Sequence, residues 1–298
     1  MKKIAVIGAG TMGNGIAHVL AQHGYPVNLI DISQEAIDQG LFTITKNLDR
    51  MVAKGKIDLG KKKDTLARLK TFVILEQGVK DVDLVIEAAT ENPEVKNTLF
   101  GKLDRVCAPH TILATNTSSI SITAIATATG RPDKVIGMHF MNPVPLMPLV
   151  ELIRGFDTSV STTESILKLS KKLGKTPVIA NDYPGFVANR ILMPMINEAI
   201  ETLFHGVSGV LEIDTVMKLG MAHPMGPLQL ADFIGLDVCL SILEVMYQGF
   251  KNPKYAPSPL LANMVMAGKL GVKSGEGFYD YSESRKAEKV ASQFVRVH

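Results

Sequence analysis

The chain has 298 residues, of which 46% are hydrophobic and 20% charged, and its formal net charge is +3. This composition supplies enough apolar side chains for a sizeable core and excludes an intrinsically disordered chain. The small net charge argues against nucleic acid as a partner. No apolar run approaches the roughly 18 residues of a membrane-spanning helix, so no membrane partner is expected. The length favours two domains.

The two cysteines, Cys107 and Cys239, lie far apart in the sequence, with no C-x-x-C motif or histidine cluster near them. Isolated thiols suit a reducing compartment. No cluster of His, Cys and Asp residues has the spacing of metal ligands, which predicts that the protein binds no metal. We therefore expect a cytoplasmic protein without a targeting extension.

The first elements of the chain predict a dinucleotide site. Residues 4–7 (IAVI) have the apolar, β-branched character of a buried parallel strand, and residues 27–30 form a second such strand. Between these strands the sequence reads G-x-G-x-x-G, at Gly8, Gly10 and Gly13. Glycines at these positions allow a tight turn and let a pyrophosphate approach a helix N-terminus, where free N–H groups favour an anion.

Asp31 indicates which dinucleotide is bound. It follows the second strand and lies 18 residues after Gly13, where a carboxylate can accept hydrogen bonds from the adenosine ribose diol. The same carboxylate would repel a 2′-phosphate, and no arginine follows it. The sequence therefore predicts NAD and not NADP as the cofactor.

Strands and helices alternate through the first part of the chain. Further strands are predicted at residues 72–75, 84–88, 111–115 and 135–139. Helices are predicted from Ser33 to about Lys54, over about 61–69, behind Pro93 and over 121–128. This alternation predicts a parallel, doubly wound sheet.

The pattern changes at Pro184-Gly185, after which apolar residues recur mostly at helical spacing, as over residues 236–246. We expect an α/β fold in which a Rossmann-type doubly wound domain over residues 1–184 is followed by an all-α domain over residues 185–298. The polar tail from Ser282 is predicted to be a surface helix or a frayed end.

A polar cluster, Asn116-Thr117-Ser118-Ser119, follows the strand that ends at Thr115. In a doubly wound sheet the ligand crevice lies at the carboxyl ends of the strands, so this loop is expected beside the cofactor. Alternatively, Ser119 or Ser121 caps the following helix. Capping explains one hydroxyl but not the whole polar set, and both interpretations stay open at this point.

The segment from His139 to Glu151 (HFMNPVPLMPLVE) consists of two apolar strands around a proline-rich turn. Its spacing is symmetric about Pro145, so a reversing turn there brings His139 and Glu151 face to face. A carboxylate beside an imidazole holds the ring in one tautomer and stabilises its charged form. The alternative is an ordinary histidine at a strand end, paired with a surface glutamate. The polar Asn142-Pro143 loop alongside favours the catalytic interpretation.

Together with the segment 182–190 (DYPGFVANR), these motifs closely resemble the L-3-hydroxyacyl-CoA dehydrogenase family, and most nearly its short bacterial 3-hydroxybutyryl-CoA dehydrogenases. The resemblance spans almost the whole chain, with GAGTMG, the Glu91-Asn92 and Lys96 region, ATNTSS, HFMNPVPLMPLVE, PGFVANR, MAHPMGPLQL and GVKSGEGFYDY in order. Two departures are minor: Met141 stands where the family often has Phe, and the tail beyond Tyr281 matches no motif.

The resemblance implies a role for each catalytic position. His139 resembles the general acid/base that moves the proton of the substrate C3 hydroxyl, and Glu151 its orienting partner. Ser118 resembles the residue that hydrogen-bonds the C3 oxygen, and Asn189 the amide of the second domain that completes the site.

The glycine turn and the resemblance together imply a set of NAD-contacting positions. These are Gly8, Gly10, Thr11, Met12, Gly13, Asp31, Glu91, Lys96, Asn116, Ser118, Asn142 and Lys273, the last reaching across from the second domain. The resemblance also implies a homodimer built through the helical second domain.

The helix after Ser33 indicates the substrate class. Lys46, Arg50 and Lys54 recur every four residues and form one basic stripe, with Asn47 on a nearby face. Most charge runs are simply solvated helix faces, but a nearly neutral protein that concentrates positive charge here suits an anionic partner. In the family this helical excursion, about residues 34–70, contacts CoA. Asn47, Arg50 and Lys54 are therefore expected to bind the acyl-CoA substrate.

The leading interpretation is NAD-dependent oxidation of a short-chain L-3-hydroxyacyl-CoA, or the reverse reaction, with 3-hydroxybutyryl-CoA and acetoacetyl-CoA as the expected pair. A related β-hydroxyacid dehydrogenase that acts on a free sugar acid would leave the basic stripe without a ligand. A dinucleotide-binding structural protein that has lost catalysis would not need His139, Glu151, Ser118 and Asn189 together.

Overall fold

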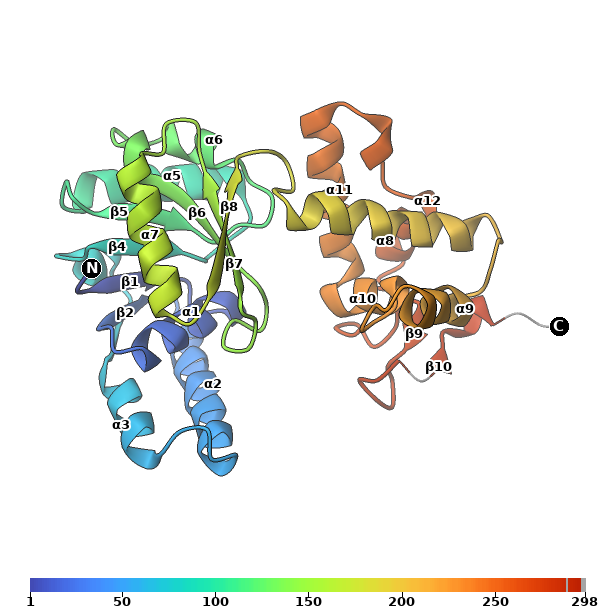
Figure 1. Ribbon diagram of the computed structural model, residues 1–298, viewed down its shortest axis with the longest axis horizontal. Coiled ribbons are helices and arrows are strands. Elements are labelled where there is room, and N and C mark those ends of the chain that lie inside the picture. Colours follow the sequence, from blue (N-terminus) through green and yellow to red (C-terminus); the bar gives the residue numbers. More distant parts are fainter. Residues whose placement is uncertain (288, 296–298) are drawn as a thin grey trace. The chain divides into compact units, whose positions relative to one another are not determined.

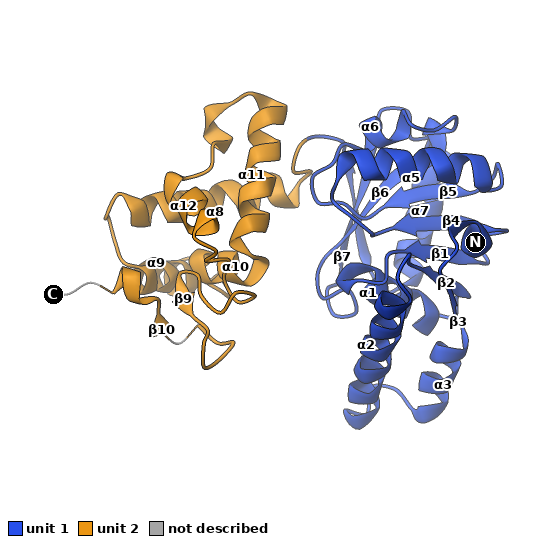
Figure 2. Ribbon diagram, turned by 180° about the vertical axis from the view of Figure 1, so that it is seen from behind, with its two compact units in different colours: residues 1–183 blue, residues 184–298 orange. Residues whose placement is uncertain are grey.

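The computed structural model describes residues 1–287 and 289–295. Contacts along the chain divide it into two compact units, Met1–Tyr183 and Pro184–His298 (Figure 2). Among the described residues, no helix has both the length and the apolar character needed to cross a membrane.

The first unit is built on an eight-stranded sheet with the order β3-β2-β1-β4-β5-β6-β7-β8 (Figure 1). Its strands are β1 (Ile4–Ile7), β2 (Val27–Ile30), β3 (Leu69–Phe72), β4 (Leu84–Glu87), β5 (Ile112–Thr115), β6 (Val135–Phe140), β7 (Leu149–Arg154) and β8 (Thr176–Asn181). Strands β1 to β6 run parallel, whereas β7 pairs antiparallel with β6 and parallel with β8. The doubly wound sheet expected from the sequence is therefore confirmed.

Helices cover both faces of this sheet, and in Figure 1 α7 lies in front of it and α5 behind. They are α1 (Thr11–Gln22), α2 (Gln34–Ala53), α3 (Leu59–Ala67), α4 (Leu75–Val79), α5 (Pro93–Val106), α6 (Ile122–Ala126) and α7 (Val160–Lys172). Several begin at side-chain caps: Ser33 accepts a hydrogen bond from the Ala36 amide, Asn92 one from Val95, and Ser121 one from Ala124.

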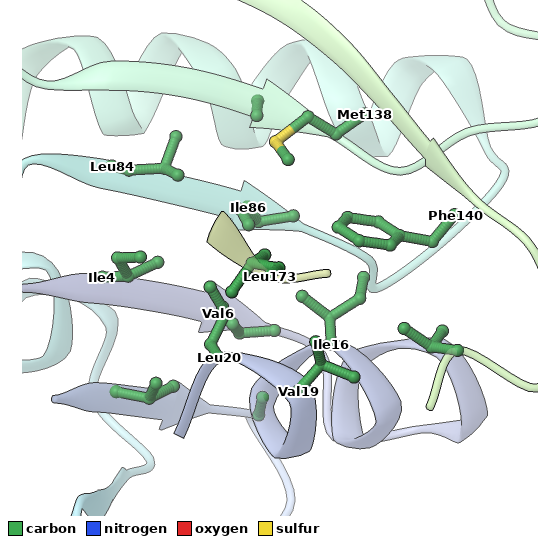
Figure 3. Close-up of a cluster of buried hydrophobic side chains, with 14 of the residues drawn as sticks. Ile4, Val6, Ile16, Val19, Leu20, Leu84, Ile86, Met138, Phe140 and Leu173 are labelled. Atoms are coloured by element: carbon green, nitrogen blue, oxygen red, sulfur yellow. The ribbon is translucent and has the colours of Figure 1, made fainter. Parts of the chain in front are cut away.

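The larger core of the first unit lies on one face of the sheet (Figure 3). Alternate strand residues such as Ile4 and Val6 point into it, because successive side chains of a strand face opposite sides. Ile16 and Leu20 of α1 and Leu173, just after α7, fill the same cluster. Burying these side chains fixes α1, and with it the glycine turn that precedes α1, against the sheet.

The predicted strand at residues 72–75 was wrong by three residues. The observed strand is β3, which pairs with β2 from Leu69 opposite Val27, and the apolar run continues into the short helix α4. Val73 and Ile74, which looked like buried strand residues, are about half exposed. The helix expected over about 61–69 begins earlier, at α3, where the Asp58 carboxylate caps its first turn.

The second unit is mainly helical. Its helices are α8 (Ala188–Phe204), α9 (Val210–Thr215), α10 (Pro227–Ile234), α11 (Leu236–Phe250) and α12 (Pro259–Met266). They enclose a core of their own that includes Ile196, Leu228 and Leu243.

The helical second domain expected from the sequence is confirmed, but the prediction for its tail needs a correction. The tail was predicted to be a surface helix or a frayed end, but β10 (Lys289–Val290) pairs antiparallel with β9 (Tyr279–Asp280). The tail is held because it has apolar groups to bury: the Phe294 ring lies 5.7 Å from the Phe278 ring, centroid to centroid. Residues 288 and 296–298 of the tail lie outside the described residues.

Candidate active site

The glycine turn between β1 and α1 can be built only from glycine at two of its positions. Gly8 has φ of +95°, and a Cβ there would lie 2.6 Å from the Ala88 carbonyl oxygen. A Cβ on Gly13 would lie 1.7 Å from the Gly8 carbonyl oxygen. A Cβ on Gly10, by contrast, would meet no atom within 4 Å. The turn is therefore closed toward the sheet and open above Gly10.

The N-terminus of α1 opens into the same space. Its N-cap, Gly10, offers no side chain to the first-turn amides, which leaves them available to an anion. At the neighbouring strand end, Asp31 accepts hydrogen bonds from the Ala9 amide at 2.8 Å and the Ser33 amide at 3.1 Å. Those bonds fix the carboxylate beside the turn. Uncapped amides and a fixed carboxylate fit the pyrophosphate and the ribose diol of a dinucleotide.

A cavity of about 380 Å³ lies between the glycine turn, α2 and the loop after β6. Gly10, Thr11, Asn14 and Gly15 form one wall, Asn142 to Pro145 a second, and residues of α2 a third. The α2 residues Ala36, Gln39, Gly40, Thr43 and Asn47 are spaced so that they share one helix face. The cavity thus joins the dinucleotide turn to the helix for which the sequence predicted CoA contacts.

The basic stripe continues from this cavity along α2. Asn47 lines the cavity, and Arg50 and Lys54 follow three and seven residues later, which keeps them near the same face. Both basic side chains are exposed, whereas the apolar side chains of Ile44 and Leu48 on the same helix are fully buried. The arrangement offers solvent-accessible positive charge to an anion that extends out of the cavity.

His139 and Glu151 meet across β6 and β7. The antiparallel register pairs the two residues directly, and Nδ1 of His139 lies 2.7 Å from Oε2 of Glu151. The carboxylate can only accept this hydrogen bond, so Nδ1 carries the proton and donates it. The side chains are 11% and 2% exposed, so the pair is shielded from water.

Glu91 organises the polar loop that follows β5. Its carboxylate accepts hydrogen bonds from the Ser118 hydroxyl at 2.9 Å, from the Ser118 amide at 2.8 Å and from the Thr117 hydroxyl at 2.6 Å. Asn116, the first residue of the loop, accepts a hydrogen bond from the Phe140 amide next to His139. The capping alternative holds for Ser121, which caps α6. Ser118 belongs to the loop at the strand ends.

Lys96, which the resemblance assigns to the cofactor, lies at the ends of β4 and β5. Its side chain is fully buried, forms an ion pair with Glu87 and donates a hydrogen bond to the Thr115 hydroxyl at 3.1 Å. Glu87 is also fully buried, and it accepts hydrogen bonds from the Thr115 hydroxyl at 2.7 Å and the Ala89 amide at 2.8 Å. The ammonium therefore supports the ends of β4 and β5 from inside the protein. Direct contact between Lys96 and a cofactor stays a prediction.

Two predicted site residues lie in the second unit. Asn189 is buried in the first turn of α8, and Lys273 forms an ion pair with Asp237 of α11. Their predicted approach to His139 and to the cofactor stays a prediction.

The sequence missed several residues that shape this site. Glu87 and Thr115 were assigned only as strand residues. The available signal was the carboxylate of Glu87 inside an apolar strand, because a buried glutamate needs a cationic partner such as Lys96. Asn14, Gln39 and Thr43 line the cavity but belong to no motif that we assigned. The described residues contain no group of three or more His, Cys, Asp or Glu side chains that could hold a metal ion.

Family models match both units. A model of the NAD binding domain of 3-hydroxyacyl-CoA dehydrogenase matches residues 3–183. A model of the C-terminal domain of 3-hydroxyacyl-CoA dehydrogenase matches residues 185–281. The two matches follow one another along the chain, as the two units do.

Individual relatives agree with the family models. A probable 3-hydroxybutyryl-CoA dehydrogenase of Deinococcus radiodurans is 56% identical over 279 residues, which cover 94% of this chain and 100% of the relative. The 3-hydroxybutyryl-CoA dehydrogenase of Bradyrhizobium diazoefficiens is 53% identical over 94% of this chain and 96% of its own length. The crystal structure of (S)-3-hydroxybutyryl-CoA dehydrogenase from Ralstonia eutropha superposes with a TM-score of 0.92 at 49% identity, covering 95% of this chain and 100% of that one.

Replacing Lys96 tests its structural role. Lys96→Met keeps the length of the side chain but leaves the Glu87 charge buried without its counter-ion. We expect a loss of about 3–5 kcal/mol in the free energy of unfolding, measured by urea denaturation. The double variant Lys96→Met/Glu87→Gln removes both charges and should recover part of that loss. As a control, Lys102→Met breaks the half-exposed pair with Glu76, which solvent screens, and should lower the free energy of unfolding far less. A Lys96→Met protein as stable as this control would contradict the assignment.

Proposed function

Because this chain belongs to the 3-hydroxyacyl-CoA dehydrogenase family, we propose that it interconverts a short-chain L-3-hydroxyacyl-CoA and the matching 3-ketoacyl-CoA, with NAD(H) as hydride acceptor or donor. We propose 3-hydroxybutyryl-CoA and acetoacetyl-CoA as the pair, since relatives at 52–56% identity bear that name. The observation that carries the proposal is the hydrogen bond between His139 and Glu151 at the carboxyl edge of the sheet.

His139 is the general acid/base of the proposed reaction. In oxidation the C3 hydroxyl loses its proton to the imidazole as the C3 hydride leaves, and a C3 carbonyl forms. Nδ1 is held by Glu151, so the exchange of this proton falls to Nε2. Glu151 fixes the tautomer and stabilises the imidazolium that results. NAD(H), when bound, takes up or supplies the hydride.

Ser118 and Asn189 position the substrate oxygen in this proposal. The Glu91 carboxylate holds the Ser118 hydroxyl from one side, which fixes the Oγ atom in the loop after β5. Asn189 contributes an amide from the start of α8. Support for these two roles comes from the matching family motifs and from the placement of Ser118 at the strand ends.

Binding of the cofactor is assigned to the glycine turn and to Asp31. The open space above Gly10 and the uncapped α1 N-terminus suit the pyrophosphate. The Asp31 carboxylate, fixed by two amides, suits the ribose diol and disfavours a 2′-phosphate. Glu91, Asn116 and Asn142 are proposed as further contacts.

We assign the CoA moiety to the basic face of α2. Asn47 lies at the cavity, and Arg50 and Lys54 extend from it as exposed cations that can pair with phosphates. A free sugar acid would not reach these cations, so the basic face favours the CoA thioester.

We also propose that the protein is a cytoplasmic homodimer that pairs through its second unit. Large apolar side chains are exposed there on several helices and turns, including Ile191, Val207, Leu219 and Met266. Large apolar side chains that gather into one exposed patch are typical of subunit contacts. Both cysteines are free and buried, as suits a reducing compartment.

The proposed acid/base pair is tested by replacing its members. His139→Gln should lower kcat with acetoacetyl-CoA and NADH by about 10²–10⁴, the usual contribution of general acid/base catalysis, with little change in NADH affinity. Glu151→Gln keeps an acceptor oxygen but loses the charge, so kcat should fall by less. Because the two residues act together, the double variant should be no slower than His139→Gln. Full wild-type kcat in Glu151→Gln would contradict the pairing.

Lys54→Ala tests whether α2 binds CoA. A charge-assisted phosphate contact is worth about 1.5–3 kcal/mol, so kcat/KM for acetoacetyl-CoA should fall about ten- to hundredfold, with the KM for NADH nearly unchanged. Rising salt should shrink the difference, because it screens exposed charges. Lys172→Ala, an exposed lysine on α7, is the matched control. If Lys54→Ala is equally impaired on an acetoacetyl-pantetheine thioester, which lacks the nucleotide, Lys54 supports structure and does not bind CoA.

A further inference from the structure

The loop between β6 and β7, residues 141–148, separates the two members of the His139–Glu151 pair and forms one wall of the 380 Å³ cavity. Its own bonds are few: the Leu146 and Met147 amides both donate to the Pro143 carbonyl at 3.0 Å. Asn142 and Pro143 are exposed and face the cavity. The position of this wall must therefore be set from outside the loop.

One side of the loop is held by Lys175, the residue just before β8. Its ammonium donates hydrogen bonds to the Val144 carbonyl at 2.5 Å and the Met147 carbonyl at 2.7 Å. The residue is 9% exposed and forms no ion pair with any residue that the structure describes. Burial lowers the pKa of its ammonium, because no carboxylate compensates for the lost hydration. Burying a cation against neutral acceptors costs folding free energy, which suggests that Lys175 serves a role other than stability.

The other side of the loop is held by α1. The Val144 side chain is 2% exposed and packs on Gly15, so closely that a Cβ on Gly15 would lie 2.9 Å from the Val144 Cβ. Gly15 lies one turn beyond Gly10, where the helix N-terminus opens to the cofactor site. Val144 is thus fixed through its carbonyl by Lys175 and through its side chain by Gly15.

We propose that Lys175 is a positioning residue that holds the 141–148 loop at the distance from α1 at which the cavity accepts its ligands. The loop carries Asn142 on the cofactor side, and across the cavity it faces α2 with Asn47. Displacing it therefore alters both ends of the cavity. The identity of the two ligands rests on the proposed function, whereas the clamp itself rests on the contacts of Lys175 and Gly15.

The clamp should affect binding more than chemistry. His139 and Glu151 are held by the β6–β7 register and by their own hydrogen bond, so they keep their geometry when the loop moves. Without the ammonium, however, the Val144 and Met147 carbonyls lose their buried donor and the loop rearranges to find others. Loss of Lys175 should thus raise Kd and KM values while kcat changes much less.

Lys175→Met is the first test, because it keeps the length of the side chain and removes the donor. The Kd for NADH, measured by fluorescence titration without substrate, and the KM for acetoacetyl-CoA should each rise about tenfold. This corresponds to about 1.4 kcal/mol for reordering the loop when a ligand binds, close to the contribution of one charge-assisted hydrogen bond of Lys175. The change in kcat should be less than about threefold, because His139 and Glu151 keep their geometry. Lys175→Arg keeps a charged donor and should recover part of the loss. Lys172→Met, an exposed lysine three residues earlier, is the matched control and should match wild type.

Gly15→Ala pushes the same loop from the opposite side with Lys175 intact, so it should also raise the Kd for NADH even if Lys175→Met fails to fold. The double variant should be less than additive, since both changes act through the loop. The proposal is overturned if Lys175→Met unfolds at a lower temperature yet binds NADH as wild type does, or if Gly15→Ala leaves the Kd unchanged. Because the NADH titration needs no acyl-CoA, failure of the clamp can be told from failure of the proposed reaction.

Discussion

The antiparallel pairing of β6 with β7 is the constraint on which the rest of the site depends. Strands β1 to β6 run parallel, and only the reversal through the 141–148 loop brings a residue of the next strand back beside His139. The register then places Glu151 directly opposite, where its carboxylate accepts the Nδ1 proton at 2.7 Å. A slip of one residue would send Glu151 to the other face of the sheet and leave the imidazole without its partner. The proposed chemistry therefore depends on sheet register as much as on residue type.

The other site residues are held by buried polar contacts at the ends of the parallel strands. Glu87 and Lys96 neutralise one another inside the protein and tie β4 to β5. Glu91 fixes the Ser118 loop, and Lys175 fixes the loop between His139 and Glu151. Each group is buried or engaged by several partners, so the edge of the sheet is organised before any ligand arrives. Such preorganisation lowers the reorganisation that binding and catalysis would otherwise require.

Much of this could be predicted from local sequence. The glycine turn and Asp31 form one contiguous unit, and the symmetry about Pro145 gave the His139–Glu151 contact without knowledge of the sheet. The buried position of Lys96 could not be predicted in this way, because its partners come from two different strands. Lys175 was missed for a similar reason: its acceptors are backbone carbonyls 28 and 31 residues away, which leave no side-chain pattern. The strand error at residues 72–75 arose because pairing with β2, and not apolar character, set the position of β3.

The central claim is that the protein moves a hydride between C4 of the nicotinamide and C3 of an acyl-CoA. The most direct test is to incubate the wild-type protein with acetoacetyl-CoA and NADH dideuterated at C4, and to analyse the product by mass spectrometry and NMR. The account predicts L-3-hydroxybutyryl-CoA with a single deuterium at C3, formed in equal amount to the NAD that appears. A product without deuterium at C3, or no consumption of NADH with this substrate, would contradict it.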